Sequence, residues 1–129
     1  LGAMDMVNFG PFDTIPEKYK GRNFYKHNPS VTLMRTSVEE NKLLGEKIAE
    51  KLNLAKKDTV LMIPKKGLSG IDMEGKPFYG PEENKMLFKT LRENINNSVI
   101  KIVEMDTDIN DKEFAERAAQ ELIAMIENK

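Results

Sequence analysis

The sequence predicts an α/β fold with an open parallel sheet flanked by helices. Strand-like and helix-like periods alternate over the second half of the chain, with short connections between most of them. The run 60–63, Val-Leu-Met-Ile, is apolar at every position, which is typical of a parallel strand buried on both faces. The length of 129 residues suits one domain, so we treat residues 1–129 as a single unit.

Residues 36–53 form the first predicted helix. Apolar residues recur there every four positions, at Leu44, Ile48 and Leu52, and charged residues cover most of the remaining surface. Thr36 and Glu39 have the spacing of a capping box, in which a hydroxyl and a carboxylate satisfy free amides at the helix start.

A strand, a long loop and a second helix follow. The strand covers residues 59–64 and ends at Pro64, and the glycine-rich loop runs over residues 65–80. Pro81 suits the first turn of a helix, where its missing amide has no cost. The helix covers residues 81–95, with one apolar side formed by Leu87, Phe88, Leu91 and Ile95.

The chain ends with a second strand and a third helix. Residues 99–105 are rich in β-branched side chains, and residues 106–111 form the loop that leaves this strand. Asn110 and Glu113 have the spacing of a second capping box. One face of the last helix carries Phe114, Ala118, Leu122, Met125 and Ile126. This strand–helix order predicts that strands 60–63 and 99–105 are parallel neighbours in a three-layer αβα, Rossmann-like sheet.

The first third of the chain has weaker patterns. Residues 4–9 and 23–25 are expected as short strands, and residues 31–34 as a strand or an extended loop. Gly10-Pro11 and Ile15-Pro16 indicate turns or extended loop between them.

Composition excludes several classes of protein. With 40% hydrophobic and 32% charged residues, the chain is neither disordered nor a membrane protein, and no apolar run approaches the ~20 residues that span a bilayer. A net charge of −1 without a basic stripe argues against nucleic acid as a partner. The absence of cysteine excludes disulfides and thiolate chemistry, and suits a cytoplasmic location.

Three segments resemble known site motifs, but each lacks a residue that the motif requires. The run 70–77 has the glycine and lysine spacing of a phosphate loop, but Pro77 replaces the required Ser or Thr. The run 67–71 lacks the second glycine of a nucleophile elbow. The run 106–117 lacks the glycine and glutamate of a calcium loop, so we predict no metal site.

A candidate ligand site lies where the predicted strands end. Ligands of open parallel sheets bind beyond the carboxyl ends of the strands, which places loops 65–80 and 106–111 at one edge. A helix start with Arg35, Lys65 and Lys66 nearby favours a small anion, although the same residues also suit ordinary caps and solvated lysines. The candidate ligand-binding residues are His27, Asn28, Arg35, Thr36, Ser69, Asp72, Asn110 and Asp111.

Short segments spread over most of the chain resemble one known family. They are the runs 2–11 (GAMDMVNFGP), 27–36 (HNPSVTLMRT), 39–41 (EEN), 63–64 (IP), 67–72 (GLSGID), 77–78 (PF), 109–111 (IND) and 114–115 (FA). Together they resemble the C-terminal domain of the Tm-like ATP-binding family. All eight candidate residues fall within these segments.

The resemblance implies that this chain is the C-terminal part of the second domain of a longer, two-domain protein. Nucleotide binding in that family belongs mainly to the N-terminal domain, so ATP is expected in the full-length protein and not on this part alone. The resemblance also implies the N-terminal domain of the same protein as a partner. Because the preceding strands and helices would then be missing, we expect an uncovered sheet edge and self-association.

Three functions remain open at this level. The chain is a ligand-binding or regulatory domain, a part of an enzyme site for a small anionic metabolite, or a structural or interaction module. If the chain is part of an enzyme site, His27 is the candidate acid or base, because the ordinary pKa of histidine lies near neutrality. Convergence of His27, Arg35, Ser69, Asp72 and Asn110 would favour the first two readings over the third.

Overall fold

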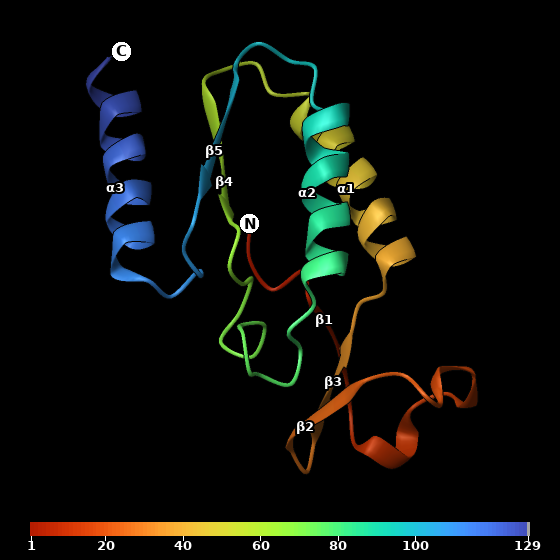
Figure 1. The fold of residues 1–129 in the computed structure, drawn as a ribbon. Helices are drawn as coiled ribbons and strands as arrows, with labels where there is room; N and C mark the ends of the chain where they lie inside the picture. The colour runs from red at the N-terminus through yellow and green to blue at the C-terminus, as the bar shows by residue number, and fades with distance from the viewer. Residues whose placement is uncertain (129) are drawn as a thin grey trace.

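The fold is mixed α/β, with two small sheets and three helices (Figure 1). It was obtained as a computed structural model, which describes residues 1–128. The elements in chain order are β1 (Met6–Phe9), the 3-10 turns η1 (Phe12–Thr14) and η2 (Glu17–Tyr19), β2 (Phe24–Asn28), β3 (Val31–Arg35), α1 (Val38–Leu52), β4 (Thr59–Pro64), α2 (Pro81–Asn94), β5 (Ile100–Met105) and α3 (Lys112–Glu127). No helix among the described residues is long and apolar enough to cross a membrane.

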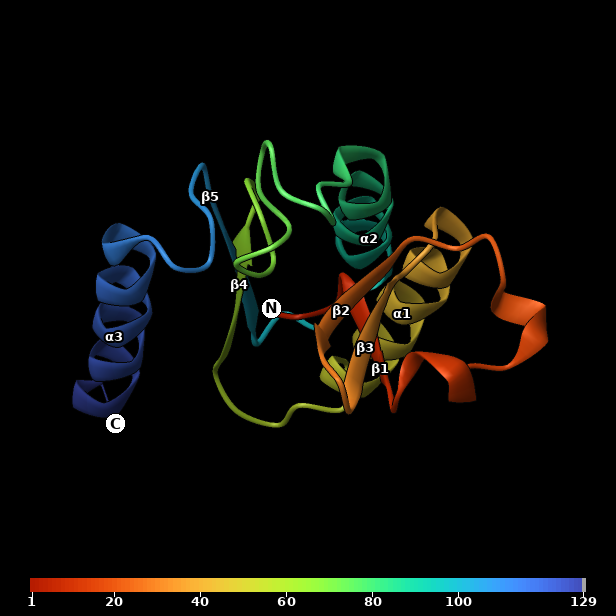
Figure 2. The same ribbon diagram turned by 90° about the horizontal axis from the view of Figure 1, so that it is seen from below.

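The second half of the chain has the predicted parallel arrangement. Strands β4 and β5 pair in parallel, from Thr59 opposite Ile100 to Pro64 opposite Met105. Helix α2 makes the crossover between them, as the strand–helix–strand order indicated. Both views of the ribbon show α3 on one side of this strand pair and α1 with α2 on the other (Figures 1 and 2). The three-layer prediction is therefore confirmed for this half.

The prediction of one open parallel sheet is wrong for the first third of the chain. Strands β1, β3 and β2 form a separate sheet in that order, and both pairings are antiparallel. Only Pro29 and Ser30 separate β2 from β3. Two residues suffice for a hairpin, whereas parallel pairing needs a crossover of about a dozen residues or more. The region 31–34, left open between strand and loop, is the central strand of this sheet.

The main apolar core lies between β4 and the pair of helices α1 and α2. Its buried members are Ala49, Leu61, Ile63, Leu68, Leu87, Phe88 and Leu91. The predicted stripes of α1 and α2 both face this core. The two helices approach closely at Gly45, where a Cβ atom would lie 2.8 Å from Thr90 Cβ. A side chain at position 45 would push the helices apart.

Both helix starts differ from the predicted capping boxes. The cap of α1 is Ser37, whose side chain accepts from Glu40 N while Glu40 accepts from Ser37 N, one residue later than predicted. The Thr36 hydroxyl donates instead to the carbonyl of Met4 at 2.8 Å. At α3 the cap residue is Asp111, which makes no side-chain bond to the helix, so the Asn110–Glu113 box is absent. Asp111 bonds to the amide of Asp108 instead.

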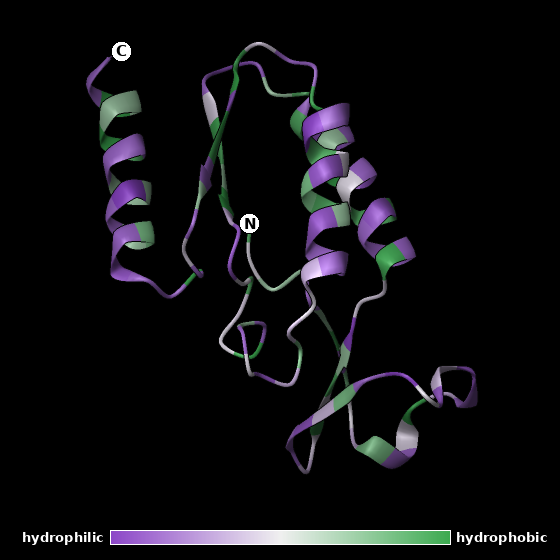
Figure 3. Cartoon of the chain, in the orientation of Figure 1, coloured by the Kyte–Doolittle hydropathy of each residue, from purple (hydrophilic) through white to green (hydrophobic). Residues whose placement is uncertain are grey.

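Helix α3 does not bury the face that its sequence indicated. Phe114 is buried, but Leu122 and Ile126 are 55% and 57% exposed. The side that meets the sheet carries Glu121, which forms ion pairs with Lys101 of β5 and with Arg117. Figure 3 shows apolar and polar residues alternating along this helix. The apolar face that the sequence placed on this helix is therefore mostly exposed beyond Phe114.

Candidate functional site

A buried polar network joins the two halves of the molecule, and Arg35 is its centre. Arg35 ends β3 and is only 5% exposed. Its guanidinium donates to five acceptors: Phe78 O at 2.9 Å, Asn84 Oδ1 at 2.9 Å, Asp72 Oδ1 at 3.1 Å, Gly80 O at 3.2 Å and Thr36 Oγ1 at 3.3 Å. A guanidinium taken out of water needs such partners, because an unpaired buried charge is very costly.

Asp72 is the counter-charge of Arg35 and is fully buried. Its carboxylate accepts from Asn84 Nδ2 at 2.7 Å, Leu68 N at 2.9 Å, Arg35 Nη2 at 3.1 Å and Gly80 N at 3.3 Å. Burial raises the pKa of Asp72, and the bonds from Leu68 and Asn84 and the charge of Arg35 oppose that rise. Four donors surround the carboxylate, which suits its ionised form.

The loop between β4 and α2 folds back so that the Asp72 carboxylate lies within hydrogen-bond distance of the Leu68 amide. Gly67 makes this possible, because a Cβ atom at that position would lie 2.1 Å from the carbonyl oxygen of Asp72. The bond from Leu68 N to Asp72 then closes the turn. Any other residue at position 67 would displace Asp72 from Arg35.

A second part of the network reaches the N-terminal segment. Asn41 Nδ2 donates to the Thr36 hydroxyl at 2.9 Å, and Thr36 N donates to Asp5 O at 3.0 Å. Asp5 is fully buried, and its Oδ2 accepts from the Ser69 hydroxyl at 2.7 Å. These bonds join the segment before β1, the start of α1 and the loop after β4.

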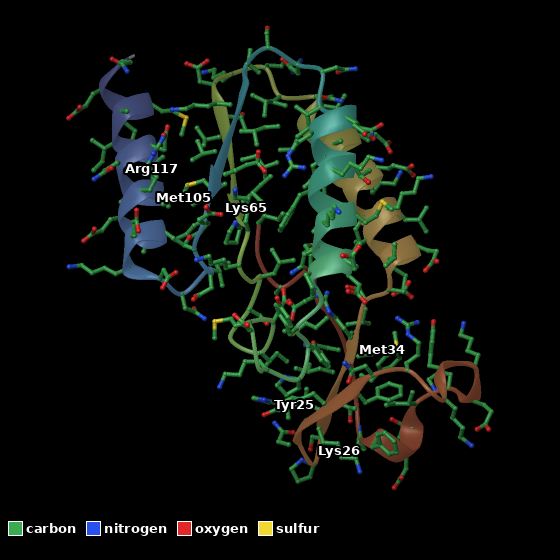
Figure 4. The ribbon with its side chains drawn as sticks, viewed as in Figure 1. Tyr25, Lys26, Met34, Lys65, Met105 and Arg117 are labelled. Carbon is green, nitrogen blue, oxygen red and sulfur yellow. The ribbon has the colours of Figure 1, made fainter. Side chains whose placement is uncertain are left out.

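A groove of about 520 Å³ opens beside this network, where the parallel strands end and α2 begins. It is lined by Lys65, Lys66, Met73, Glu74, Tyr79, Pro81, Asn84 and Asp108. Asn84 is 5% exposed and belongs to both the groove and the network, since it bonds to Arg35 and to Asp72. Figure 4 shows Lys65 close to Met105, where both strands end. Asn84 thus connects the groove to the hydrogen bonds around Arg35 and Asp72.

The two loops predicted at one sheet edge do lie together there. Gly67 and Asp108 form a parallel bridge beyond the last strand pair. Lys66 N donates to Thr107 O at 3.0 Å, and Ile109 N donates to Gly67 O at 3.0 Å. The prediction is confirmed, and its reason is that parallel strands end on the same side.

The predicted site residues fall into three groups. Arg35, Thr36 and Asp72 bond directly to one another through Arg35, and Ser69 joins them through Asp5. These residues lie behind the groove and not along its wall.

Asn110 and Asp111 lie in the loop after β5 and shape the turn that presents Asp108. Asn110 N donates to Asp108 Oδ1 at 2.7 Å, and Asp111 Oδ2 accepts from Asp108 N at 3.0 Å. His27 and Asn28 are exposed at the end of the β2–β3 hairpin, and no hydrogen bond among the described residues links them to Arg35. Asn28 instead accepts from Ser30 N within the hairpin turn.

Sequence reasoning missed Asp5, Asn41 and Asn84. Asn41 and Asn84 each occupy a position on the apolar stripe of their helix, three residues before Leu44 and Leu87. A polar residue in register with a buried stripe is a usable signal, because buried polar groups must find partners. Asp5 lies between Met4 and Met6 in a short strand-like run, and its burial follows only from the packing of α1 and loop 65–80.

The charges of the groove are mixed. Lys65 pairs with Asp106 at 3.1 Å, and Lys66 lies next to it, while Glu74 and Asp108 contribute carboxylates. Among residues 1–128 no group of three or more His, Asp or Glu side chains is placed to hold a metal ion. The wall therefore offers two ammonium groups, an amide and two carboxylates to a ligand.

Comparison with known proteins places the chain in a family. Residues 1–126 match the model of the uncharacterised protein family UPF0261, C-terminal domain. The chain belongs to this family. A UPF0261 protein of Clostridium tetani is 60% identical over 126 residues, which are 98% of this chain and 31% of that protein. A UPF0261 protein of Rhizobium meliloti is 44% identical over 92% of this chain and 30% of its own length.

A plant relative carries a functional name. The ToMV resistance protein Tm-1(GCR237) of Solanum lycopersicum is 45% identical over 116 residues, which are 89% of this chain and 15% of that protein. The chain thus spans about a third of the length of its bacterial UPF0261 relatives and less of the tomato protein. The family relationship that the short segments indicated is confirmed for the C-terminal domain.

Proposed function

We propose that this UPF0261 domain binds a small anionic ligand in the groove at the carboxyl ends of β4 and β5. It would act as the ligand-binding or regulatory part of a longer, nucleotide-linked protein of the cytoplasm, in which ATP binds another domain. The observation that carries the proposal is the position of Lys65 and Lys66 in a groove at the start of α2. Ligands of parallel α/β sheets bind at this edge.

The start of α2 offers backbone amides to an anion, and the carboxylates of Glu82 and Glu83 in its first turn oppose this attraction. Gly80 caps the helix without a side-chain hydrogen bond, and Pro81, the first helical residue, lines the groove. The first amides of a helix have no partner within it, and its dipole favours negative charge there. Lys65 and Lys66 add formal positive charge beside this helix end.

The carboxylates of Glu74 and Asp108 in the groove restrict which ligands can bind there. A ligand that was anionic throughout would be repelled by Glu74 and Asp108. A ligand with hydroxyl groups beside its phosphate or carboxylate would donate to these carboxylates and present its charge to the lysines. Asn84 is held by Arg35 and Asp72, so its side chain needs no reordering when the ligand binds.

The test is a titration of the isotopically labelled chain with a phosphorylated sugar, followed by NMR, with pyrophosphate as the comparison that should bind more weakly. We expect shifts at Lys65, Lys66, Tyr79 and the start of α2. Lys66→Gln should weaken binding by about tenfold, the loss of one charge-assisted hydrogen bond. Lys42→Gln, on the exposed surface of α1, is the matched control and should leave binding unchanged.

The longer Clostridium tetani protein allows the test to be repeated, with Gln placed at the positions that align with Lys66 and Lys42. The proposal is wrong if the shifts cluster outside the groove or if Lys66→Gln and Lys42→Gln bind equally well. Saturation only at concentrations where any basic surface binds phosphate would also refute it.

A further inference from the structure

One edge of β4 is free of β5 and presents backbone groups of its own. Thr59 N donates to Val99 O at 3.0 Å, and Lys65 N donates to Met105 O at 2.9 Å, so odd-numbered residues of β4 face β5. Successive peptide groups of a strand point to opposite edges. Val60 and Met62 therefore direct their N–H and C=O groups to the edge away from β5.

The first residues of the chain already occupy the end of this edge. The amine of Leu1 donates to Met62 O at 3.0 Å, and Ala3 N donates to Leu68 O at 2.8 Å. Both segments advance in the same direction, so Leu1 lies against β4 as a residue of a parallel strand would. Figures 1 and 2 both show the N-terminus beside β4 on the side away from β5.

The surroundings of Leu1 suit a peptide better than a charged amine. The Leu1 side chain packs on the apolar core. Burial lowers the pKa of its amine, because the ammonium loses water there. A backbone amide at this point would make the same bond to Met62 O without a charge to desolvate.

We propose that the free edge of β4 takes a third parallel strand, supplied by the segment that precedes this domain in the longer UPF0261 proteins. The register follows from the Leu1 bond: the residue two positions before Leu1 would donate to Val60 O and accept from Met62 N. The Clostridium tetani protein has the necessary length, since this chain spans 31% of it.

The strand would be apolar, because it would lie next to the core with helices over it. Partly buried side chains of α1 and of the end of α2 already pack against that core, and the added strand would bury them further. They are Leu44, Ile48, Leu52 and Ile95. Parallel strands between helices are apolar on both faces. The proposal is independent of the anion site, which lies beyond the carboxyl ends of the strands.

The experiment extends the chain at Leu1 with the eight residues that precede the matched segment in the Clostridium tetani protein. Hydrogen exchange of the Met62 amide, followed by NMR, should slow by about tenfold or more in the extended chain, because that amide gains a partner. Proline two positions before Leu1 should abolish the protection, since it removes the donor to Val60 O.

Proline one position before Leu1 is the matched control, because the amide at that position points away from β4 and protection should persist. Unchanged exchange of Met62 in the extended chain overturns the proposal. Equal effects of the two prolines overturn the register and with it the parallel strand. Protection that rises with protein concentration shows that a second copy, and not the preceding segment, covers the edge.

Discussion

The two flanks of the β4–β5 pair differ in how deeply their helices are buried. On the α1–α2 flank, Leu87 and Leu91 are fully buried, and the charged Arg35 and Asp72 are buried as well. On the α3 flank the helix itself buries Phe114 among its described residues, while Leu122, Ile123 and Ile126 are all more than half exposed. Helices α2 and α3 are both amphipathic in sequence. The difference shows that an apolar stripe predicts a helix but does not determine which surface the helix buries.

The contacts behind this difference are of two kinds. Helix α2 is held by apolar burial and by Asn84, which ties its first turn to Arg35 and Asp72. Helix α3 meets the sheet through Phe114 and through Glu121, which pairs with Lys101 and Arg117. Exposed ion pairs contribute little stability, about 0–1 kcal/mol each. The first flank should therefore dominate the free energy of unfolding.

The largest expected effect comes from Asp72→Ala. Removing the carboxylate leaves Arg35 buried without its counter-charge, which costs about 3–5 kcal/mol in comparable buried pairs. Urea unfolding should show the loss. Asp106→Ala, which breaks the exposed pair with Lys65, is the control and should cost less than about 1 kcal/mol. Similar losses for both variants would contradict the enclosed network.

Truncation of one leucine on each flank tests the comparison directly. Leu91→Ala should destabilise the fold by about 2–5 kcal/mol, because it leaves a cavity in the core. Leu122→Ala, on an exposed position of α3, should change stability by about 0.5 kcal/mol or less. Thermal unfolding of the two variants gives the contrast. A large loss for Leu122→Ala would mean that α3 is covered in solution, for example by a second copy of the chain.

The helix caps provide a smaller contrast. Ser37→Ala removes the hydroxyl that accepts from Glu40 N and should cost about 1 kcal/mol. Asp111→Ala removes no side-chain bond to α3 and should cost about half as much or less, through the lost bond to Asp108. Equal losses in chemical denaturation would show that Asp111 caps α3 after all.

The smallest effect concerns acid stability. The hydrogen bond from Arg22 lowers the pKa of Glu40 below its ordinary value of 4.5. An acid with a lowered folded pKa stabilises the fold above its unfolded pKa, and this contribution is lost as pH falls through the folded value. The pair is partly solvated, so we expect about 1 kcal/mol or less. Glu40→Gln should flatten the unfolding free energy below pH 4.5; an unchanged slope would discount the Arg22 contact.

Local patterns in the sequence determined much of the α1–α2 flank. Period-four stripes located α1 and α2, and the apolar run of β4 indicated a parallel strand. The strand–helix–strand order then predicted the parallel pairing with β5, and with it the common edge of loops 65–80 and 106–111. Arg35, Thr36, Ser69 and Asp72 were identified as candidates, and they do gather at one place.

Tertiary structure alone decided the rest. The hairpin between β2 and β3 turned the first third into an antiparallel sheet and left His27 exposed at its end. Asn84 became the link between groove and network only when the turn at Gly67 placed Asp72 beside it. The face that α3 buries depends on the free energy of its contacts with β5, and those contacts join residues far apart in the chain. Periodicity in the sequence predicts which face of a helix is apolar. It does not predict whether that face is buried, because burial also depends on the surface against which the helix packs.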